Sequence, residues 1–132
     1  MIARTENRAR ILIVEDVEET REAIQELLKR DGYLVDPAKD EDEAIERAER
    51  NHPCLILISL DGKPEEMEAT AQRIRRRSGL TQQTPVVIFS LAALPEGAEK
   101  ELAGNIHVTA PDSFDQLRTL LKRTLRGTFR TH

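Results

Sequence analysis

The stretch His52-Pro53-Cys54-Leu55-Ile56-Leu57-Ile58-Ser59-Leu60-Asp61 decides how this chain folds. Its apolar run from Leu55 to Ile58 has no polar alternation, and it ends at the polar Ser59. A short run of this kind is typical of a β-strand that is buried on both faces. We therefore place a central strand here and expect helices to cover it on both sides.

Two further apolar runs match the central one, at residues 11–14 before it and at residues 86–89 after it. The three runs end in small or acidic residues, namely Glu15 and Asp16, Ser59, and Ser90. The carboxyl ends of parallel strands lie at one edge of the sheet, where open α/β sheets bind their ligands. We expect these four side chains to form the functional site.

The segments between the strands have the apolar spacing of helices. Helices are expected over residues 17–30, 40–50, 65–78, 94–103 and 113–125. Two short strands are expected at residues 33–35 and 106–108, the first of them ended by Pro37. Five strands alternating with five helices predict a doubly wound α/β domain. Its five-stranded parallel sheet, with flavodoxin-like strand order, would be the middle layer of an α/β/α sandwich.

Local signals support several helix ends. Asp40 with Glu43, and Ser113 with Gln116, have the spacing of capping pairs at helix starts. The run Arg75–Arg77 is interpreted as the solvated end of the third helix, where cations are favoured by the helix dipole.

Length and composition limit the possible classes of protein. The 132 residues suit a single domain over 1–132, with a core at about 10–125 and flexible ends at 1–9 and 127–132. A net charge of −4 argues against a general nucleic-acid binder. No apolar run approaches the ~20 residues of a membrane span, and the first ten residues lack the apolar core of a signal peptide. We expect a cytoplasmic protein.

The order and spacing of these segments resemble the receiver domain of bacterial two-component response regulators, over about residues 10–125. The matching segments are Ile11–Asp16, Tyr33–Ile45, Pro53–Leu60, Pro85–Ser90 and His107–Pro111. The resemblance implies a signalling domain without enzymatic activity of its own. Such a domain accepts a phosphoryl group on an aspartate at the end of the central strand, beside a Mg²⁺ ion, a hydroxyl group and a lysine.

This sequence departs from that pattern at two positions. The acceptor position is Ser59, and the lysine position is Ala110. The acidic pair and the hydroxyl of Ser90 remain, and His107 occupies the aromatic switch position. Because both the nucleophile and the cation are missing, we expect a degenerate receiver that has lost phosphotransfer. No cofactor is expected beyond weak Mg²⁺ binding at the acidic pair. His107 is open to interpretation as a pH-sensitive switch or as an ordinary strand histidine.

Three functions are weighed. The first is a stand-alone, phosphorylation-independent interaction module that contacts a histidine kinase, another regulator or an effector through its last strand and the flanking helices. A second copy of the chain is a further candidate partner, whereas nucleic acid and membranes are not expected. The second is an active phosphorelay receiver whose acceptor is Asp61 or Ser59. The third, an unrelated α/β enzyme or nucleotide binder, is disfavoured because no Gly-rich phosphate loop follows the first strand.

Overall fold

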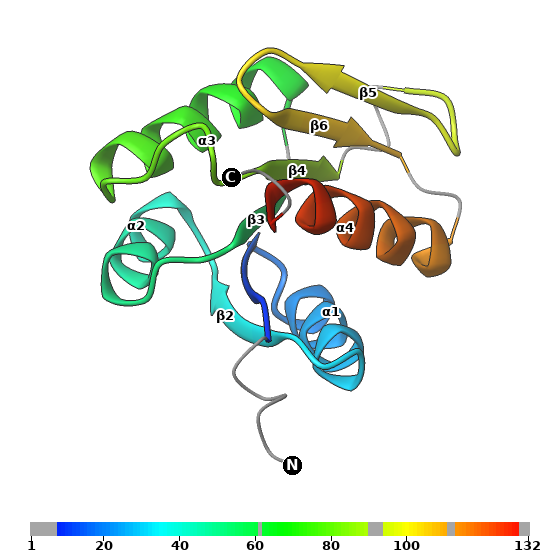
Figure 1. The fold of residues 1–132 in the computed structure, drawn as a ribbon, viewed down its shortest axis with the longest axis horizontal. Helices are drawn as coiled ribbons and strands as arrows, with labels where there is room; N and C mark the ends of the chain where they lie inside the picture. Colours follow the sequence, from blue (N-terminus) through cyan, green and yellow to red (C-terminus); the bar gives the residue numbers. More distant parts are fainter. Residues whose placement is uncertain (1–7, 61, 90–93, 111–112, 130–132) are drawn as a thin grey trace.

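The computed structural model describes residues 8–60, 62–89, 94–110 and 113–129. Figure 1 shows a central sheet with helices on both sides. In chain order the elements are β1 (Arg10–Glu15), α1 (Glu18–Arg30), β2 (Leu34–Ala38), α2 (Glu41–Arg50), β3 (Leu55–Ser59), α3 (Pro64–Arg77), β4 (Val86–Phe89), β5 (Glu99–Leu102), β6 (Ile106–Thr109) and α4 (Phe114–Phe129).

The sheet has six strands in the order β2-β1-β3-β4-β6-β5. All neighbouring strands run parallel except β5, which pairs antiparallel with β6 at one edge. Helices α2 and α3 cover one face of the sheet, and α1 and α4 cover the other (Figure 1). The predicted doubly wound, three-layer α/β/α class is therefore confirmed, whereas the prediction of a five-stranded, wholly parallel sheet is wrong because the antiparallel β5 adds a sixth strand. None of the described helices is long and apolar enough to cross a membrane.

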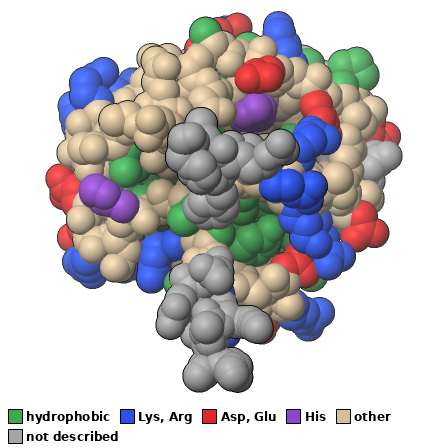
Figure 2. Space-filling view, in the orientation of Figure 1, with side chains coloured by type: hydrophobic (Ala, Val, Ile, Leu, Met, Phe, Trp, Pro, Cys, Tyr) green, Lys and Arg blue, Asp and Glu red, His purple; other side chains and the backbone are tan. Residues whose placement is uncertain are grey.

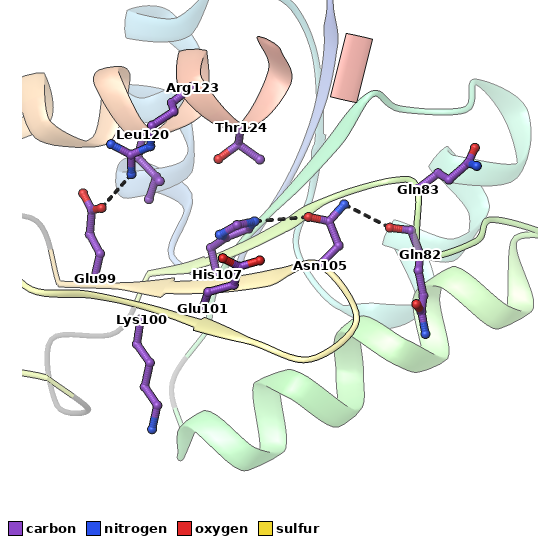
Figure 3. Close-up of a pocket in the computed structure, with 10 residues that line it drawn as sticks. All are labelled: Gln82, Gln83, Glu99, Lys100, Glu101, Asn105, His107, Leu120, Arg123 and Thr124. Carbon is purple, nitrogen blue, oxygen red and sulfur yellow. Dashed lines mark hydrogen bonds and ion pairs between the residues drawn. The ribbon is translucent and has the colours of Figure 1, made fainter. Parts of the chain in front are cut away.

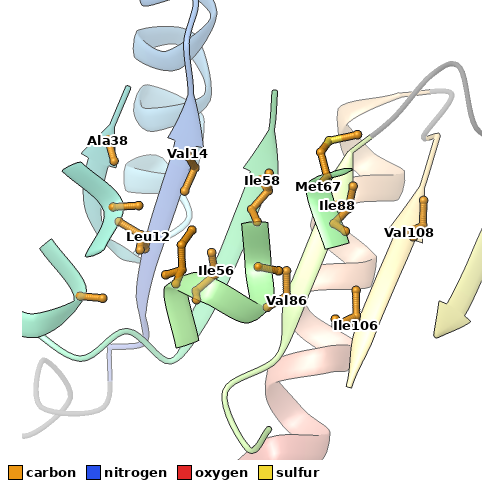
Figure 4. Packing of buried hydrophobic residues seen from close by; sticks show 14 residues of the cluster. Leu12, Val14, Ala38, Ile56, Ile58, Met67, Val86, Ile88, Ile106 and Val108 are labelled. Atoms are coloured by element: carbon orange, nitrogen blue, oxygen red, sulfur yellow. The ribbon is translucent and has the colours of Figure 1, made fainter. Parts of the chain in front are cut away.

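The central strands contribute side chains to two cores, one on each face. Leu12, Ile56 and Ile88 point toward α2 and α3, with at most 1% of their surface exposed (Figure 4). Their neighbours along the strands, such as Leu57 and Val87, point toward α1 and α4 and are equally buried. Each such side chain stabilises the fold by roughly 1.5–3 kcal/mol, so the apolar runs fix both the sheet and its two coverings.

Both predicted capping positions are occupied as expected. The amide of Glu43 donates to Oδ1 of Asp40 at 2.9 Å, and the amide of Gln116 donates to Oγ of Ser113 at 3.3 Å. The Gln116 side chain also reaches back along the chain, because its Nε2 donates to the carbonyl of Gly97 at 2.7 Å. It therefore ties the start of α4 to the segment before β5.

The helix predicted over residues 94–103 is wrong. Within the described part of this segment the regular element is strand β5, and its Leu102 packs against the core on the α3 side. Alanine, glutamate, lysine and leucine favour a helix locally, but the edge of β6 offers backbone partners that override this preference. Gly104 and Asn105, both with positive φ, make the tight turn between β5 and β6.

Two predicted boundaries also need correction. Pro37 lies inside β2 and does not end it, since β2 is an edge strand on which a missing N–H can face away from the sheet. Helix α4 continues to Phe129, where a loose tail was expected from residue 127, and the buried Leu125 anchors its last part to the core. The flexible end expected over residues 1–9 is wrong at Ala9, which is buried and whose carbonyl accepts from the amide of Leu34 at 2.9 Å. Residues 1–7 and 130–132 lie outside the described residues.

Arg75 is buried, with 5% of its surface exposed, whereas a solvated helix end was predicted. From α3 its guanidinium donates to the carbonyls of Thr84, Gly104 and Asn105, at 3.0 Å from Nε, 2.7 Å from Nη1 and 3.1 Å from Nη2, respectively. One side chain thus joins α3 to the loop before β4 and to the β5–β6 turn. Burial lowers the pKa of this guanidinium. Its neighbour Arg76 is exposed.

We predict that Arg75→Leu lowers the free energy of unfolding by about 2–4 kcal/mol, because three carbonyls would lose their charged donor. Arg75→Lys should recover only part of this loss, since an ammonium group cannot reproduce the planar fork. Urea denaturation measures the effect, with the exposed Arg76→Leu as the matched control. Equal stability of the Arg75→Leu and Arg76→Leu variants would contradict the assignment.

Candidate functional site

The sheet brings the end of β1 next to the end of β3. Glu15 and Ser59 are direct partners in the parallel register of these strands. The corresponding pair in the other half of the sheet is Phe89 on β4 and Thr109 on β6. The carboxyl ends of β1 and β3 therefore do meet at the predicted edge of the sheet. Ser90 and Asp61, which were also predicted to belong to the site, lie outside the described residues.

Glu15 is the buried acid of this edge, with 3% of its surface exposed. Its Oε2 accepts a hydrogen bond from the amide of Val17 at 3.0 Å, and the Ser59 side chain lies close enough to influence its pKa. Burial raises the pKa of Glu15 above its ordinary value, and the adjacent Asp16 adds to the increase. The hydrogen bond from Val17 and the nearby Ser59 side chain oppose the shift without reversing it. Glu15 is thus a carboxyl group with increased affinity for a proton.

The expected Mg²⁺ site at the acidic pair can be compared only with the described residues. Asp16 is exposed beside the buried Glu15, and Ser59 contributes a hydroxyl where a third carboxylate would be needed. Within the described ranges, no group of three or more His, Cys, Asp or Glu side chains is placed to hold a metal ion. Mg²⁺ prefers octahedral oxygen ligands that include carboxylates. The described donors do not assemble such a set, and weak Mg²⁺ binding stays a prediction.

Ala110 is completely buried and is held by its backbone. Its amide donates to the carbonyl of Ala98 at 3.1 Å, and its carbonyl accepts from the amide of Gly97 at 2.6 Å. The neighbouring Thr109 hydroxyl also faces the carbonyl of Ala98, at 3.5 Å. The segment before β5 therefore covers the position at which the resemblance implies a lysine.

His107 does not join the Glu15–Ser59 pair. It lies in the middle of β6 and lines a pocket of about 730 Å³ between the β5–β6 hairpin and α4 (Figure 3). Its Nε2 lies 3.2 Å from Oδ1 of Asn105. Burial is the main cause that lowers the pKa of His107 below 6.5.

The sequence analysis did not predict the burial of Arg75 or the β5–β6 hairpin, although the sequence contains a signal for each. Arg75 is four positions from Ala71 and one from Ile74, which places it on the buried face of α3. The dipeptide Gly104-Asn105 before Ile106 is a hairpin signal. With that hairpin recognised, residues 99–102 would have been assigned as a strand, and the pocket beside it would have been expected.

A doubly wound sheet with a buried acid at the end of its first strand, paired to the end of its central strand, defines a receiver-type α/β signalling domain. The chain belongs to the response regulator receiver domain family, whose sequence profile matches residues 11–122. Domains of this family act in two-component systems, where they interact with histidine kinases and other signalling proteins.

Individual relatives agree with this assignment. The chain is 32% identical over 115 residues to the sensor histidine kinase AruS of Pseudomonas aeruginosa, a match that covers 84% of this chain and 11% of AruS. It is 27% identical over 135 residues to the probable transcriptional regulator ycf27 of Guillardia theta, covering 96% of this chain and 51% of that protein. The chain thus spans at most about half of these two relatives.

A solved structure supports the fold alone. The receiver domain of a signal transduction histidine kinase from Syntrophus aciditrophicus superposes with a TM-score of 0.72 at 21% identity. The match covers 94% of this chain and 95% of that domain.

The raised pKa of Glu15 predicts a pH-dependent stability. Because folded Glu15 holds its proton more tightly than unfolded Glu15, its contribution is fully present below about pH 4.5 and is lost as the pH rises through the raised pKa. Glu15→Gln should therefore gain stability relative to the native chain as the pH rises from 4 to 7.5. Urea denaturation across this range measures the difference, with exposed Glu22→Gln as the charge control. A difference that does not change with pH would contradict this prediction.

Proposed function

We propose that this chain is a receiver-like interaction module that works without phosphorylation at the usual position. The observation that carries the proposal is the pairing of Ser59 with Glu15 at the ends of β3 and β1. A hydroxyl stands where the family resemblance implies a phospho-accepting carboxylate, and it lies beside Glu15 at the ends of two paired strands. The covered Ala110 offers no cation for phosphoryl oxygens.

The proposed contact surface is revised by the fold. A partner was expected to use the last strand and its flanking helices; in the fold β5 pairs with the edge of β6, and Arg123 of α4 donates to Glu99 of β5 at 2.7 Å. We therefore place the partner surface on the β5–β6 hairpin and α4. We further propose that the chain acts in the cytoplasm, has no catalytic activity of its own and contacts a histidine kinase, another regulator, an effector or a second copy of itself.

One observation favours a second candidate function, that of a phosphorelay receiver with a changed acceptor. The Glu15 carboxylate lies beside the Ser59 side chain across the strand pair and has a raised pKa, so it is placed as a general base beside a hydroxyl. With acetyl phosphate, the Ser59 oxygen would attack phosphorus, the bond to acetate would break, and the hydroxyl proton would pass to Glu15. The product would be a serine ester, whereas an acceptor at Asp61 would give an acyl phosphate.

Intact mass after incubation with acetyl phosphate and Mg²⁺ tests both functions. We expect no added phosphoryl group on the native chain. A mass increase that survives hydroxylamine and disappears in Ser59→Ala would establish the serine acceptor. An increase that hydroxylamine removes, and that disappears in Asp61→Asn, would establish the relocated aspartate. Either gain would overturn the proposed phosphorylation-independent role.

The variant Ser59→Asp serves as the positive control for the assay. If it takes up phosphate while the native chain does not, the pocket retains its geometry and the nucleophile alone is missing. The double variant Ser59→Asp/Ala110→Lys tests whether the segment that covers Ala110 can make room for a cation. We expect this double variant to be less stable than Ser59→Asp, because residue 110 is completely buried and a lysine there would overpack its surroundings and bury a charge.

A further inference from the structure

The pocket beside His107 has walls from three parts of the fold (Figure 3). The β5–β6 hairpin contributes Glu101, Asn105 and His107, the loop before β4 contributes Gln82, and α4 contributes Leu120. Leu120 is 2% exposed and belongs to the core, so it gives the pocket an apolar wall. None of the residues lining the pocket belongs to the Glu15–Ser59 pair.

A chain of hydrogen bonds fixes the proton on the His107 ring. Nδ2 of Asn105 donates to the carbonyl of Gln82 at 3.0 Å, so it is Oδ1 of Asn105 that faces Nε2 of His107 at 3.2 Å. Because an amide oxygen can only accept, Nε2 must carry the proton, and Nδ1 of the neutral ring is an acceptor. No described residue donates a hydrogen bond to this Nδ1.

Glu101 supplies a second unused acceptor next to the ring. It is the direct partner of His107 across the antiparallel pair, and its carboxylate lies beside the imidazole in Figure 3. Among the described residues it has neither an ion pair nor a hydrogen bond.

The cations near the pocket do not neutralise this carboxylate. The Arg123 guanidinium is paired with Glu99 at 2.7 Å. The ammonium group of Lys100 points away from His107, as expected from the alternation of side chains along β5 (Figure 3). The pocket therefore combines two acceptors that have no donor among the described residues, one of them the carboxylate of Glu101, with the apolar Leu120.

We propose that this pocket receives a basic side chain, a lysine or an arginine, from a partner protein. The charged end would donate to Glu101 and to Nδ1 of His107, and the aliphatic stem would lie against Leu120. The inference rests on the proposed role as an interaction module and specifies the chemistry that its partner presents. It also assigns a role to the hairpin that takes the place of the expected helix.

Binding of this kind depends on pH through His107. The charged groups that face the ring are Glu99 and Glu101 from β5, Arg123 from α4 and Arg75 from α3. Burial and the two arginines lower the pKa of His107, and the two glutamates oppose this shift. Below that pKa the ring gains a proton on Nδ1, becomes a donor and repels a cation. The affinity for a basic side chain therefore falls as the pH drops through the pKa of His107.

The test uses the whole chain and two small probes, Nα-acetyl-lysine methylamide and its neutral analogue Nα-acetyl-norleucine methylamide. In an NMR titration at pH 7.5 we expect the lysine probe, and not the norleucine probe, to shift the His107 ring and hairpin amide resonances. Glu101→Gln should weaken binding about tenfold, because a charge-assisted hydrogen bond is lost. Glu49→Gln, on the exposed face of α2, is the matched control and should leave the affinity unchanged.

Two further arms complete the test. At a pH below the pKa of His107 the lysine probe should bind more weakly to the native chain, while His107→Gln should show little change with pH. Equal shifts from both probes, or no shift from the lysine probe, would overturn the proposal. Failure of the proposed function has a separate readout, since phosphate uptake by the native chain leaves the probe titration unaffected.

Discussion

The burial of β1, β3 and β4 on both faces is the constraint on which the rest of the structure depends. Side chains such as Leu12 and Leu57 lose their contact with water only if helices lie on both sides of the sheet. The helices that cover the two faces lie in the connections between successive strands, and such crossovers make the strands parallel and place their carboxyl ends at one edge. The pairing of Glu15 with Ser59 is thus a consequence of packing, and its chemistry depends on which residues occupy those two ends.

The position of the β5–β6 hairpin depends on polar contacts more than on apolar burial. Arg75 donates to carbonyls in the β5–β6 turn and in the loop before β4, and Gln116 donates to the carbonyl of Gly97 in the segment before β5. These contacts connect α3 and α4 to the same short stretch of chain. A partner that occupies the pocket beside His107 would therefore touch a region connected to both helical layers, which suits a domain that passes a signal through contact.

Local sequence signals were sufficient for the parallel strands, the helix starts at Asp40 and Ser113, and the edge that carries the site. They failed at residues 94–103, where helix propensity competes with a strand partner that only the fold provides. They failed at Arg75 because a run of three arginines suggests solvent exposure until the helix face is considered. The placement of Ser59 beside Glu15 depends on strand register, which is a tertiary property.

The two edge strands limit how this domain can assemble. An unpaired strand edge offers free N–H and C=O groups to any other extended chain. At one edge of this sheet Pro37 removes a donor from β2, and at the other edge β5 presents the charged side chains of Glu99, Lys100 and Glu101. A second chain that tried to extend the sheet would lose a hydrogen bond at the first edge and would have to desolvate charges at the second. Edge-to-edge aggregation between copies of this chain is therefore disfavoured.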